Sequence, residues 1–218
     1  MPSILALDQG TTSSRALVVH QDGTVLGSGR REFPQHFPEP GWVEHDPEDL
    51  VQSTILAARE ALAASREQPA GIGITNQRET IVLWDRETLR PAAPAIVWQD
   101  RRTAGRCRDL KAAGLEPDIR SRTGLVLDPY FSATKLEWLL RDPDLFRRAE
   151  RGELAAGTVD SWLIARLTGG RIHVTDPTNA SRTMLYGLGS GAWDRDLAAQ
   201  FGVPDRLLPE LVPSSGVV

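Results

Sequence analysis

Cysteine is almost absent from this sequence, and its absence limits the sites and compartments that the protein can have. Cys107 is the only cysteine among 218 residues, so no disulfide can form within the chain. One thiol and four histidines cannot supply a closed structural zinc site built from thiolates. A reducing cytosol suits such a sequence, and we expect a cytoplasmic protein.

Targeting signals are also missing. No Lys or Arg precedes Arg15, whereas Asp8 stands early in the chain, and this is the wrong charge order for a signal peptide. No apolar run approaches the length that spans a membrane. We therefore expect no membrane anchor.

Lysine is nearly as scarce, and its positions exclude two phosphate chemistries. The two lysines, Lys111 and Lys135, follow Leu110 and Thr134, whereas a Walker loop needs Gly-Lys before Ser or Thr. Neither lysine lies in a Val-Ala-Ile-Lys strand and no His-Arg-Asp triplet occurs, which excludes a protein kinase. The loose Gly-x-Gly-x-x-Gly/Ala pattern at 187–192 is followed by too few residues for a dinucleotide-binding unit.

Positive charge is not concentrated anywhere. The net charge of −4 and the short, scattered arginine pairs leave no electrostatic footprint for nucleic acid or anionic lipid. With 40% apolar and 25% charged residues, the composition is that of a globular protein with one large domain, or one with an insertion.

Strand and helix signals alternate along most of the chain. Three short strands form a meander at the start, and the later alternation of strands and helices predicts an α/β domain on a mixed sheet. Strands are expected at 4–7, 15–20, 24–33, 70–75, 80–84, 95–98 and 154–156, helices at 103–113, 131–140 and 159–167, and a loop at 176–182. The apolar pair at 217–218 predicts the start of another strand.

The first helix has the strongest start signal. Asp46 can cap it and Pro47 suits its first position. Its expected apolar face, spaced four, three and four residues apart, consists of Val51, Ile55, Ala58 and Leu62.

The first strand ends in a carboxylate, Asp8, followed by a glycine turn rich in hydroxyls. Such a turn can aim backbone N–H groups at a phosphate. Thr11, Thr12 and Ser13 can donate hydrogen bonds and Arg15 can offset phosphate charge, while Asp8 suits Mg²⁺ directly or through water. A plain hairpin, in which the same side chains only satisfy the turn's own backbone, is the alternative on this segment alone.

Arg78 and Glu79 lie between two strand signals. A guanidinium donates to a hydroxyl oxygen and a carboxylate accepts from a hydroxyl hydrogen, so together they suit a polyol. Neighbours on a strand point to opposite faces, so both can serve one ligand only if the chain turns or bulges here. A surface hairpin tip with an ordinary ion pair is the alternative.

Two aromatic residues complete the candidate substrate site. Trp98 ends a strand and Tyr130 follows Asp128-Pro129. An indole can cover the carbon skeleton of a small polyol and a phenol can offer its hydroxyl. Burial in the core is the alternative for both.

Several segments together resemble one family, in the same order along the chain. The motif from Asp8 to Arg15 resembles the first phosphate motif of the actin, Hsp70 and sugar-kinase superfamily, in the form typical of the glycerol kinases of the FGGY carbohydrate kinase family. The other similar segments are 40–47, 73–80, 96–103, 124–125, 128–132, the Lys-x-x-Trp at 135–138, 157–160 and 173–184. His45 and Asp160 belong to these segments without a chemical role of their own.

This resemblance implies a ribonuclease-H-like fold of the actin, Hsp70 and hexokinase type and an enzyme about twice this long. Residues 1–218 would be an incomplete N-terminal FGGY domain, without the C-terminal one. The implied function is phosphorylation of glycerol by ATP in glycerol catabolism, with Mg²⁺ and ATP as cofactors and glycerol and ATP/ADP as partners. Asp8 would bind the metal, Thr11, Thr12, Ser13 and Arg15 the phosphates, and Arg78, Glu79, Trp98 and Tyr130 the glycerol.

No catalytic residue is expected in this chain, because the family's general-base aspartate would lie beyond Val218. The chain alone should therefore be inactive. The alternatives are another FGGY kinase, acting on a substrate such as xylulose or gluconate, and a non-catalytic nucleotide-binding module. The sequence leaves open whether the protein is a homo-oligomer.

Overall fold

The computed structural model describes residues 2–217. They divide into two compact units, which are described separately. The first contains the residues up to His36 together with His45–Gln77, and the second contains Phe37–Glu44 together with the residues from Arg78 onward. No helix within residues 2–217 has both the length and the apolar character needed to cross a membrane.

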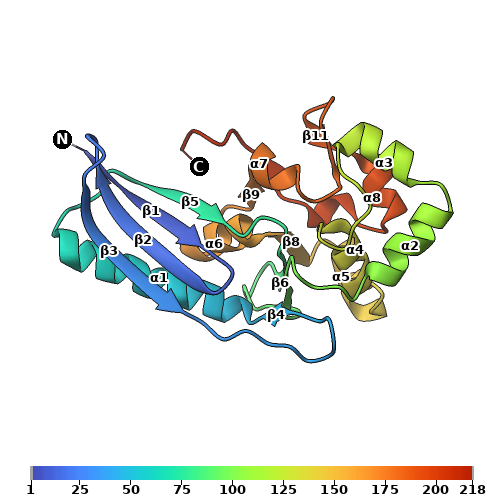
Figure 1. Ribbon diagram of the computed structural model, residues 1–218, viewed down its shortest axis with the longest axis horizontal. Coiled ribbons are helices and arrows are strands. Elements are labelled where there is room, and N and C mark those ends of the chain that lie inside the picture. Colours follow the sequence, from blue (N-terminus) through green and yellow to red (C-terminus); the bar gives the residue numbers. More distant parts are fainter. Residues whose placement is uncertain (1, 218) are drawn as a thin grey trace. The chain divides into compact units, whose positions relative to one another are not determined.

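The first unit is a four-stranded sheet with one long helix. The expected meander is confirmed: β1 (Ser3–Gln9), β2 (Ser13–His20) and β3 (Val25–Glu32) are antiparallel neighbours. Helix α1 (Pro47–Ser65) then leads to β5 (Gly71–Asn76), which pairs in parallel with β1, so the sheet order is β3-β2-β1-β5 (Figure 1). Alternate residues of β1 are buried, as a half-covered strand requires.

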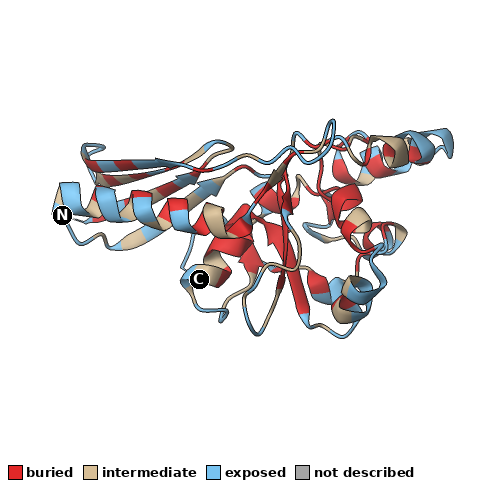
Figure 2. Ribbon diagram, turned by 90° about the horizontal axis from the view of Figure 1, so that it is seen from below, coloured by how far each residue is buried: buried red, intermediate tan, exposed pale blue. Residues whose placement is uncertain are grey.

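Helix α1 begins as expected but buries a different face. The Asp46 side chain accepts a hydrogen bond from Glu48 N at 2.8 Å, and Pro47 opens the helix. Figure 2 shows that the helix is buried on one side and exposed on the other. Of the expected face only Val51 is buried, and Ile55, Ala58 and Leu62 are half-buried. The buried line is Leu50, Thr54, Ala57 and Ala61.

Close packing of α1 on β3 explains this rotation. A Cβ atom at Gly29 would lie 2.2 Å from Ala57 O, and one at Gly27 would lie 2.3 Å from Ala61 O. The glycines let the helix backbone lie directly on the strand, so small residues occupy the contact. An apolar pattern weighted toward large side chains therefore selects a face displaced by one residue from the buried line, and Ala58 and Leu62 on that face still pack against the core of this unit.

The second unit has a buried central sheet. Strands β7 (Ala95–Ile96), β6 (Ile81–Asp85) and β8 (Leu154–Thr158) follow one another in that order, and Glu44 of the two-residue strand β4 (Glu44–His45) adds to the β7 edge. Of the nine residues from Ile81 to Trp84 and from Leu154 to Thr158, all are buried. Such unbroken apolar burial is typical of strands covered on both faces.

Much of the rest of this unit is helical. The helices are α2 (Ala104–Ala112), α3 (Glu116–Thr123), α4 (Ala133–Leu139), α5 (Pro143–Glu150), α6 (Val159–Leu167), α7 (Pro177–Ala180), α8 (Arg195–Gln200) and the 3₁₀ turn η1 (Asp205–Leu207). Two strand pairs complete the unit: β9 (Val174–Thr175) with β12 (Glu210–Leu211), and β10 (Tyr186–Gly187) with β11 (Ala192–Trp193). The mixed α/β fold is thus confirmed.

Four helices were not expected from the sequence. Helices α3, α5 and α8 are short and have few apolar residues, and α7 lies inside the expected loop at 176–182. Asp142-Pro143 and Asp176-Pro177 start two of them with the same cap that Asp46-Pro47 provides for α1. The loop expectation was wrong because this capping signal outweighs the polar composition that follows it.

Smaller expectations have mixed outcomes. The glycine pattern at 187–192 joins β10 to β11 as a tight turn, not a strand to a helix, so it has no dinucleotide-binding geometry. Asp160 is buried and accepts hydrogen bonds from Thr158 and Thr175 at 2.5 and 2.7 Å, and burial raises its pKa to about 6. The strand expected at 217–218 reaches past the described residues and stays a prediction, as does the single incomplete domain over 1–218.

Candidate functional site

The turn between β1 and β2 is closed tightly. Gly10 N donates to Ser13 O at 3.0 Å, so Thr11 and Thr12 form its tip. A Cβ atom on Gly10 would lie 3.0 Å from the same carbonyl oxygen, which explains the glycine. Ser13 Oγ accepts from Arg30 Nε at 3.2 Å, so this hydroxyl is held from the neighbouring strand.

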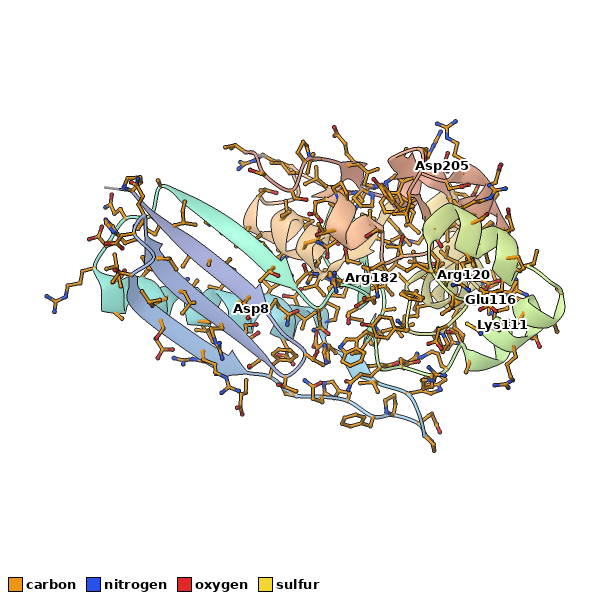
Figure 3. All side chains as sticks on the ribbon, turned by 45° about the horizontal axis from the view of Figure 1, so that its top comes forward. Asp8, Lys111, Glu116, Arg120, Arg182 and Asp205 are labelled. Atoms are coloured by element: carbon orange, nitrogen blue, oxygen red, sulfur yellow. The ribbon has the colours of Figure 1, made fainter. Side chains whose placement is uncertain are left out.

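Asp8 and Arg15 lie opposite each other on adjacent strands, one residue pair before the strand ends that meet the turn. The strand register pairs Asp8 with Arg15 across β1 and β2, and with Thr75 across β1 and β5. Both charged side chains are exposed, and Figure 3 labels Asp8 at the end of its strand. Arg15 therefore lies directly across from Asp8 in the strand register, two residues after the turn. The phosphate role of both residues stays a prediction.

A buried network of amide and imidazole groups supports the turn from within the same unit. Gln77 Nε2 donates to Gln9 Oε1 and to Gly10 O, each at 3.1 Å, and lies 3.3 Å from His45 Nδ1. His45 Nε2 lies 2.7 Å from Gln35 Oε1. An amide oxygen only accepts, so His45 carries its proton on Nε2 and accepts from Gln77 through Nδ1.

His45 must stay neutral for this arrangement. Burial, with His36 as a smaller contribution, lowers the pKa of His45 to about 4. The imidazole is therefore uncharged near neutral pH, and Nδ1 remains an acceptor. The sequence identified His45 and Gln77 only as parts of a motif, because their contact depends on β5 ending beside the start of α1.

A metal site can be tested against these residues. Within residues 2–217 no group of three or more His, Cys, Asp or Glu side chains is arranged to hold a metal ion. Mg²⁺ often uses one or two carboxylates, several waters and the phosphates of its nucleotide. An exposed carboxylate at Asp8, next to a turn with hydroxyls, fits that second kind of site and not an all-protein cage.

In the second unit, a carboxylate, a guanidinium and two aromatic rings lie together. Glu79 is only 3% exposed, and Arg182 Nε donates to its Oε1 at 2.8 Å. The Arg182 Cζ atom lies 5.8 Å from the centre of the Tyr130 ring. The Tyr130 and Trp98 ring centres are 5.5 Å apart, with the planes at 63°. The structure thus brings together three of the four residues expected to bind substrate.

The electrostatics of this cluster keep its phenol protonated. Burial and the charge of Glu79 raise the pKa of Tyr130 above its ordinary value, so the hydroxyl remains a donor. Tyr130 and Trp98 are both half-buried, so neither is a plain core residue. The cluster has an acceptor, cationic and neutral donors, and exposed parts of two rings.

Arg78 is placed differently from its neighbour. Strand β5 ends at Asn76 and the chain turns at residues 78 and 79, as sharing one ligand would require. Glu79 is buried whereas Arg78 is exposed. The simple surface ion pair between them is wrong, because the partner of Glu79 is Arg182. A ligand contact of Arg78 stays a prediction.

Arg182 is the residue that the sequence did not single out. It lies 103 positions after Glu79 and follows the short helix α7, and Figure 3 labels it. The only available signal was its place in the similar segment 173–184, which gave it no chemical role. The ion pair depends on two loops that meet only in the folded unit.

Comparison with known proteins shows the family to which the chain belongs. The model for the N-terminal domain of the FGGY family of carbohydrate kinases matches residues 3–218. The chain therefore belongs to the FGGY family of carbohydrate kinases. Among curated proteins it is 59% identical to a glycerol kinase from Alkalilimnicola ehrlichii, over 100% of this chain and 45% of that protein. A glycerol kinase from Ralstonia nicotianae is 56% identical over 99% of this chain and 44% of its own length.

Solved structures show the same fold. A Plasmodium falciparum glycerol kinase with ADP has a TM-score of 0.91 at 33% identity, covering 97% of this chain and 43% of that one. A xylulose kinase from Rhodospirillum rubrum has a TM-score of 0.86 at 27% identity, covering 97% and 43%. The chain thus spans less than half the length of these relatives.

Proposed function

We propose that this chain supplies the phosphate turn and the polyol-binding residues of a kinase that transfers the γ-phosphoryl group of ATP to glycerol. The observation that carries the proposal is the cluster of Glu79, Arg182, Tyr130 and Trp98. Its chemistry suits a small molecule with several hydroxyl groups and a short carbon skeleton. Identity of 59% to a glycerol kinase favours glycerol over other polyols.

In this proposal Glu79 accepts a hydrogen bond from one hydroxyl of the substrate. Arg182 stays hydrogen-bonded to the Glu79 carboxylate and fixes its orientation. Arg78, which lies in the same turn as Glu79, donates a hydrogen bond to another hydroxyl of the substrate. Tyr130 and Trp98 cover the carbon skeleton and exclude water from one side. These contacts fix the orientation of the hydroxyl that attacks, which is the main demand that phosphoryl transfer makes on a protein.

The β1–β2 turn would hold the nucleotide phosphates through Thr11, Thr12 and Ser13, with Arg15 offsetting charge. Mg²⁺, held through Asp8 and water, would neutralise charge on the transferring phosphoryl group. The substrate oxygen forms the new bond to the γ-phosphorus while the bond to ADP breaks. The hydroxyl proton would pass to a general-base aspartate that we expect outside this chain.

The test is a substrate panel on the longer protein in which this chain is followed by the second half that its relatives possess. ADP release is coupled to NADH oxidation with glycerol, xylulose and gluconate as acceptors. We expect kcat/KM for glycerol to exceed the others by at least about 100-fold, because a site that pairs polar groups rejects poor matches strongly. Preference for a ketose or an acid would replace the assignment with another FGGY kinase. The 218-residue chain alone is expected to be inactive.

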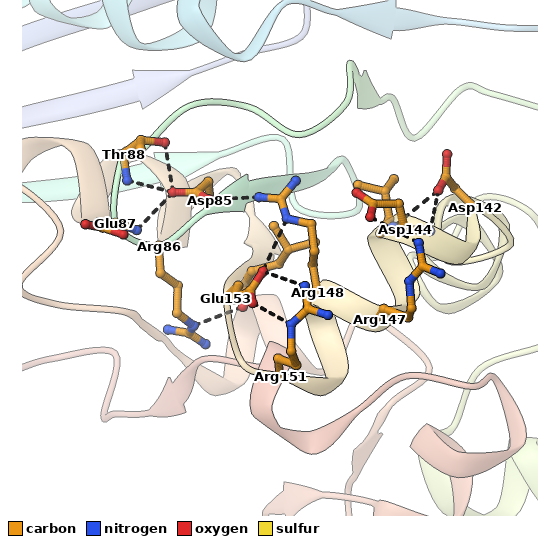
Figure 4. A network of polar contacts seen from close by, with 12 residues as sticks. Asp85, Arg86, Glu87, Thr88, Asp142, Asp144, Arg147, Arg148, Arg151 and Glu153 are labelled. Atoms are coloured by element: carbon orange, nitrogen blue, oxygen red, sulfur yellow. Dashed lines mark hydrogen bonds and ion pairs between the residues drawn. The ribbon is translucent and has the colours of Figure 1, made fainter.

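The role of Arg182 can be tested with a matched arginine. Replacing Arg182 with Met should raise KM for glycerol by about 10-fold or more, because a buried carboxylate loses its charged partner. Arg148 is the control: it is 25% exposed and paired with Asp85 at 2.8 Å in a separate network (Figure 4). Arg148→Met should leave KM unchanged. Equal effects of the two substitutions would mean that the loss is one of stability and not of substrate binding.

A further inference from the structure

Lys135 is a fully buried lysine that neither the phosphate turn nor the polyol cluster explains. It lies on α4 with 0% of its surface exposed. Its Nζ donates to Tyr130 O at 2.6 Å and lies 3.5 Å from Glu79 O. The two carbonyl groups that it contacts thus belong to two of the proposed substrate-binding residues.

The carboxylates around Lys135 do not depend on it for charge compensation. Burial lowers the pKa of Lys135 to about 7, against the opposing effect of Asp100, Glu79 and Asp128, with a smaller one from Cys107. Each of the three carboxylates has an arginine of its own, at 2.8, 2.8 and 3.0 Å: these are Arg102 for Asp100, Arg182 for Glu79 and Arg101 for Asp128. Lys135 is therefore not needed as their counter-ion.

The direct partners of Lys135 are backbone oxygens. Ser132 Oγ also donates to Glu79 O, at 3.1 Å, so α4 holds this carbonyl at two points. Glu79 and Tyr130 both lie in turns, where no strand or helix hydrogen bonds fix the backbone. Anchoring both carbonyls to one helix fixes the two side chains relative to each other, which a site for a small substrate requires.

We propose that Lys135 is a positioning residue for substrate: its side-chain amino group hydrogen-bonds the backbone carbonyls of Glu79 and Tyr130, ties both to α4 and so fixes their side chains relative to each other. This inference rests on the proposed polyol kinase function. Lys135 does not touch the substrate. Its loss is felt through the geometry of the residues that do, and displacements of about 1 Å at such a site can cost up to 100-fold.

The experiment compares Lys135→Met with Lys111→Met in the longer protein. Methionine keeps an unbranched chain but cannot donate. Lys111 is the matched control, since it is the other lysine, is 44% exposed and pairs with Glu116 at 3.1 Å. We expect Lys135→Met to raise KM for glycerol at least about 10-fold, with KM for ATP changed less than twofold. Lys111→Met should change neither constant.

A purely structural role would not separate the two substrates. If folded Lys135→Met protein keeps the KM for glycerol, or raises both KM values alike, the positioning role is refuted. Should that variant fail to fold, Ser132→Ala and Lys135→Arg take its place. Each alters one anchor of the Glu79 carbonyl and should raise KM for glycerol about two- to fivefold, and unchanged values in both would also refute the proposal. Absence of glycerol turnover in the unsubstituted protein instead refutes the function on which it rests.

Discussion

Replacing Gly29 with alanine tests the packing that places α1 against the sheet of the first unit. The new Cβ atom would lie 2.2 Å from Ala57 O and 2.8 Å from Glu60 Cβ. A backbone oxygen at that distance cannot rotate away, as a side chain can. Helix and strand must separate by roughly 1 Å, and overpacking of this kind costs about 1–3 kcal/mol, occasionally more.

The cost of Gly29→Ala should lie at the upper end of that range, because the atom that the new methyl group meets belongs to the backbone. We expect a loss of about 3 kcal/mol in unfolding free energy, which for a chain of this size corresponds to a fall of roughly 6–12 °C in Tm. Circular dichroism gives the Tm. Hydrogen exchange of α1 amides shows whether the first unit is the one that opens, since two units need not unfold together.

Gly73→Ala is the matched control. Gly73 also lies in a strand of this sheet, β5, but a Cβ atom there meets nothing within 4 Å. Because alanine restricts the unfolded chain, this change should be neutral or stabilise by up to about 1 kcal/mol. The packing explanation fails if Gly29→Ala shifts Tm by no more than Gly73→Ala, or if exchange in α1 stays unchanged.

Three further outcomes can be measured. Because His45 has a pKa of about 4 in the folded protein and an ordinary value of 6.5 in the unfolded chain, only the unfolded chain binds the extra proton between these values. The free energy of unfolding should therefore fall by up to about 3 kcal/mol as the pH drops through this window. Measured by urea unfolding, it should fall less with pH in His45→Gln. The same pH dependence in both proteins would refute the role of His45. Asp8→Asn should raise the Mg²⁺ concentration needed for half-maximal activity of the longer protein at least about tenfold. The control Asp22→Asn, in an exposed turn, should leave it unchanged. Equal shifts in the two variants would exclude Asp8 as a ligand. Burial raises the pKa of Cys107 to about 11, so iodoacetamide should modify it only after denaturant is added, and rapid labelling of native protein would contradict this burial.

Local signals in the sequence predicted much of the fold. The meander, the Asp46 cap and the helix at 159–167 follow from strand alternation, turn residues and capping, which act over a few neighbouring positions. The short helices α5 and α7 carried the same Asp-Pro start but too few apolar residues to be recognised. Their stability comes from the unit around them and not from their own pattern.

The sequence by itself determined the family, the ordered motifs and the residue types available for phosphate and polyol chemistry. Only the tertiary structure decided which of them meet. Glu79 pairs with Arg182 rather than with its neighbour Arg78, and Lys135 reaches the backbone of Glu79 and Tyr130. A buried carboxylate or ammonium group needs a partner wherever the fold provides one, and the loops that provide it here are up to 103 positions apart.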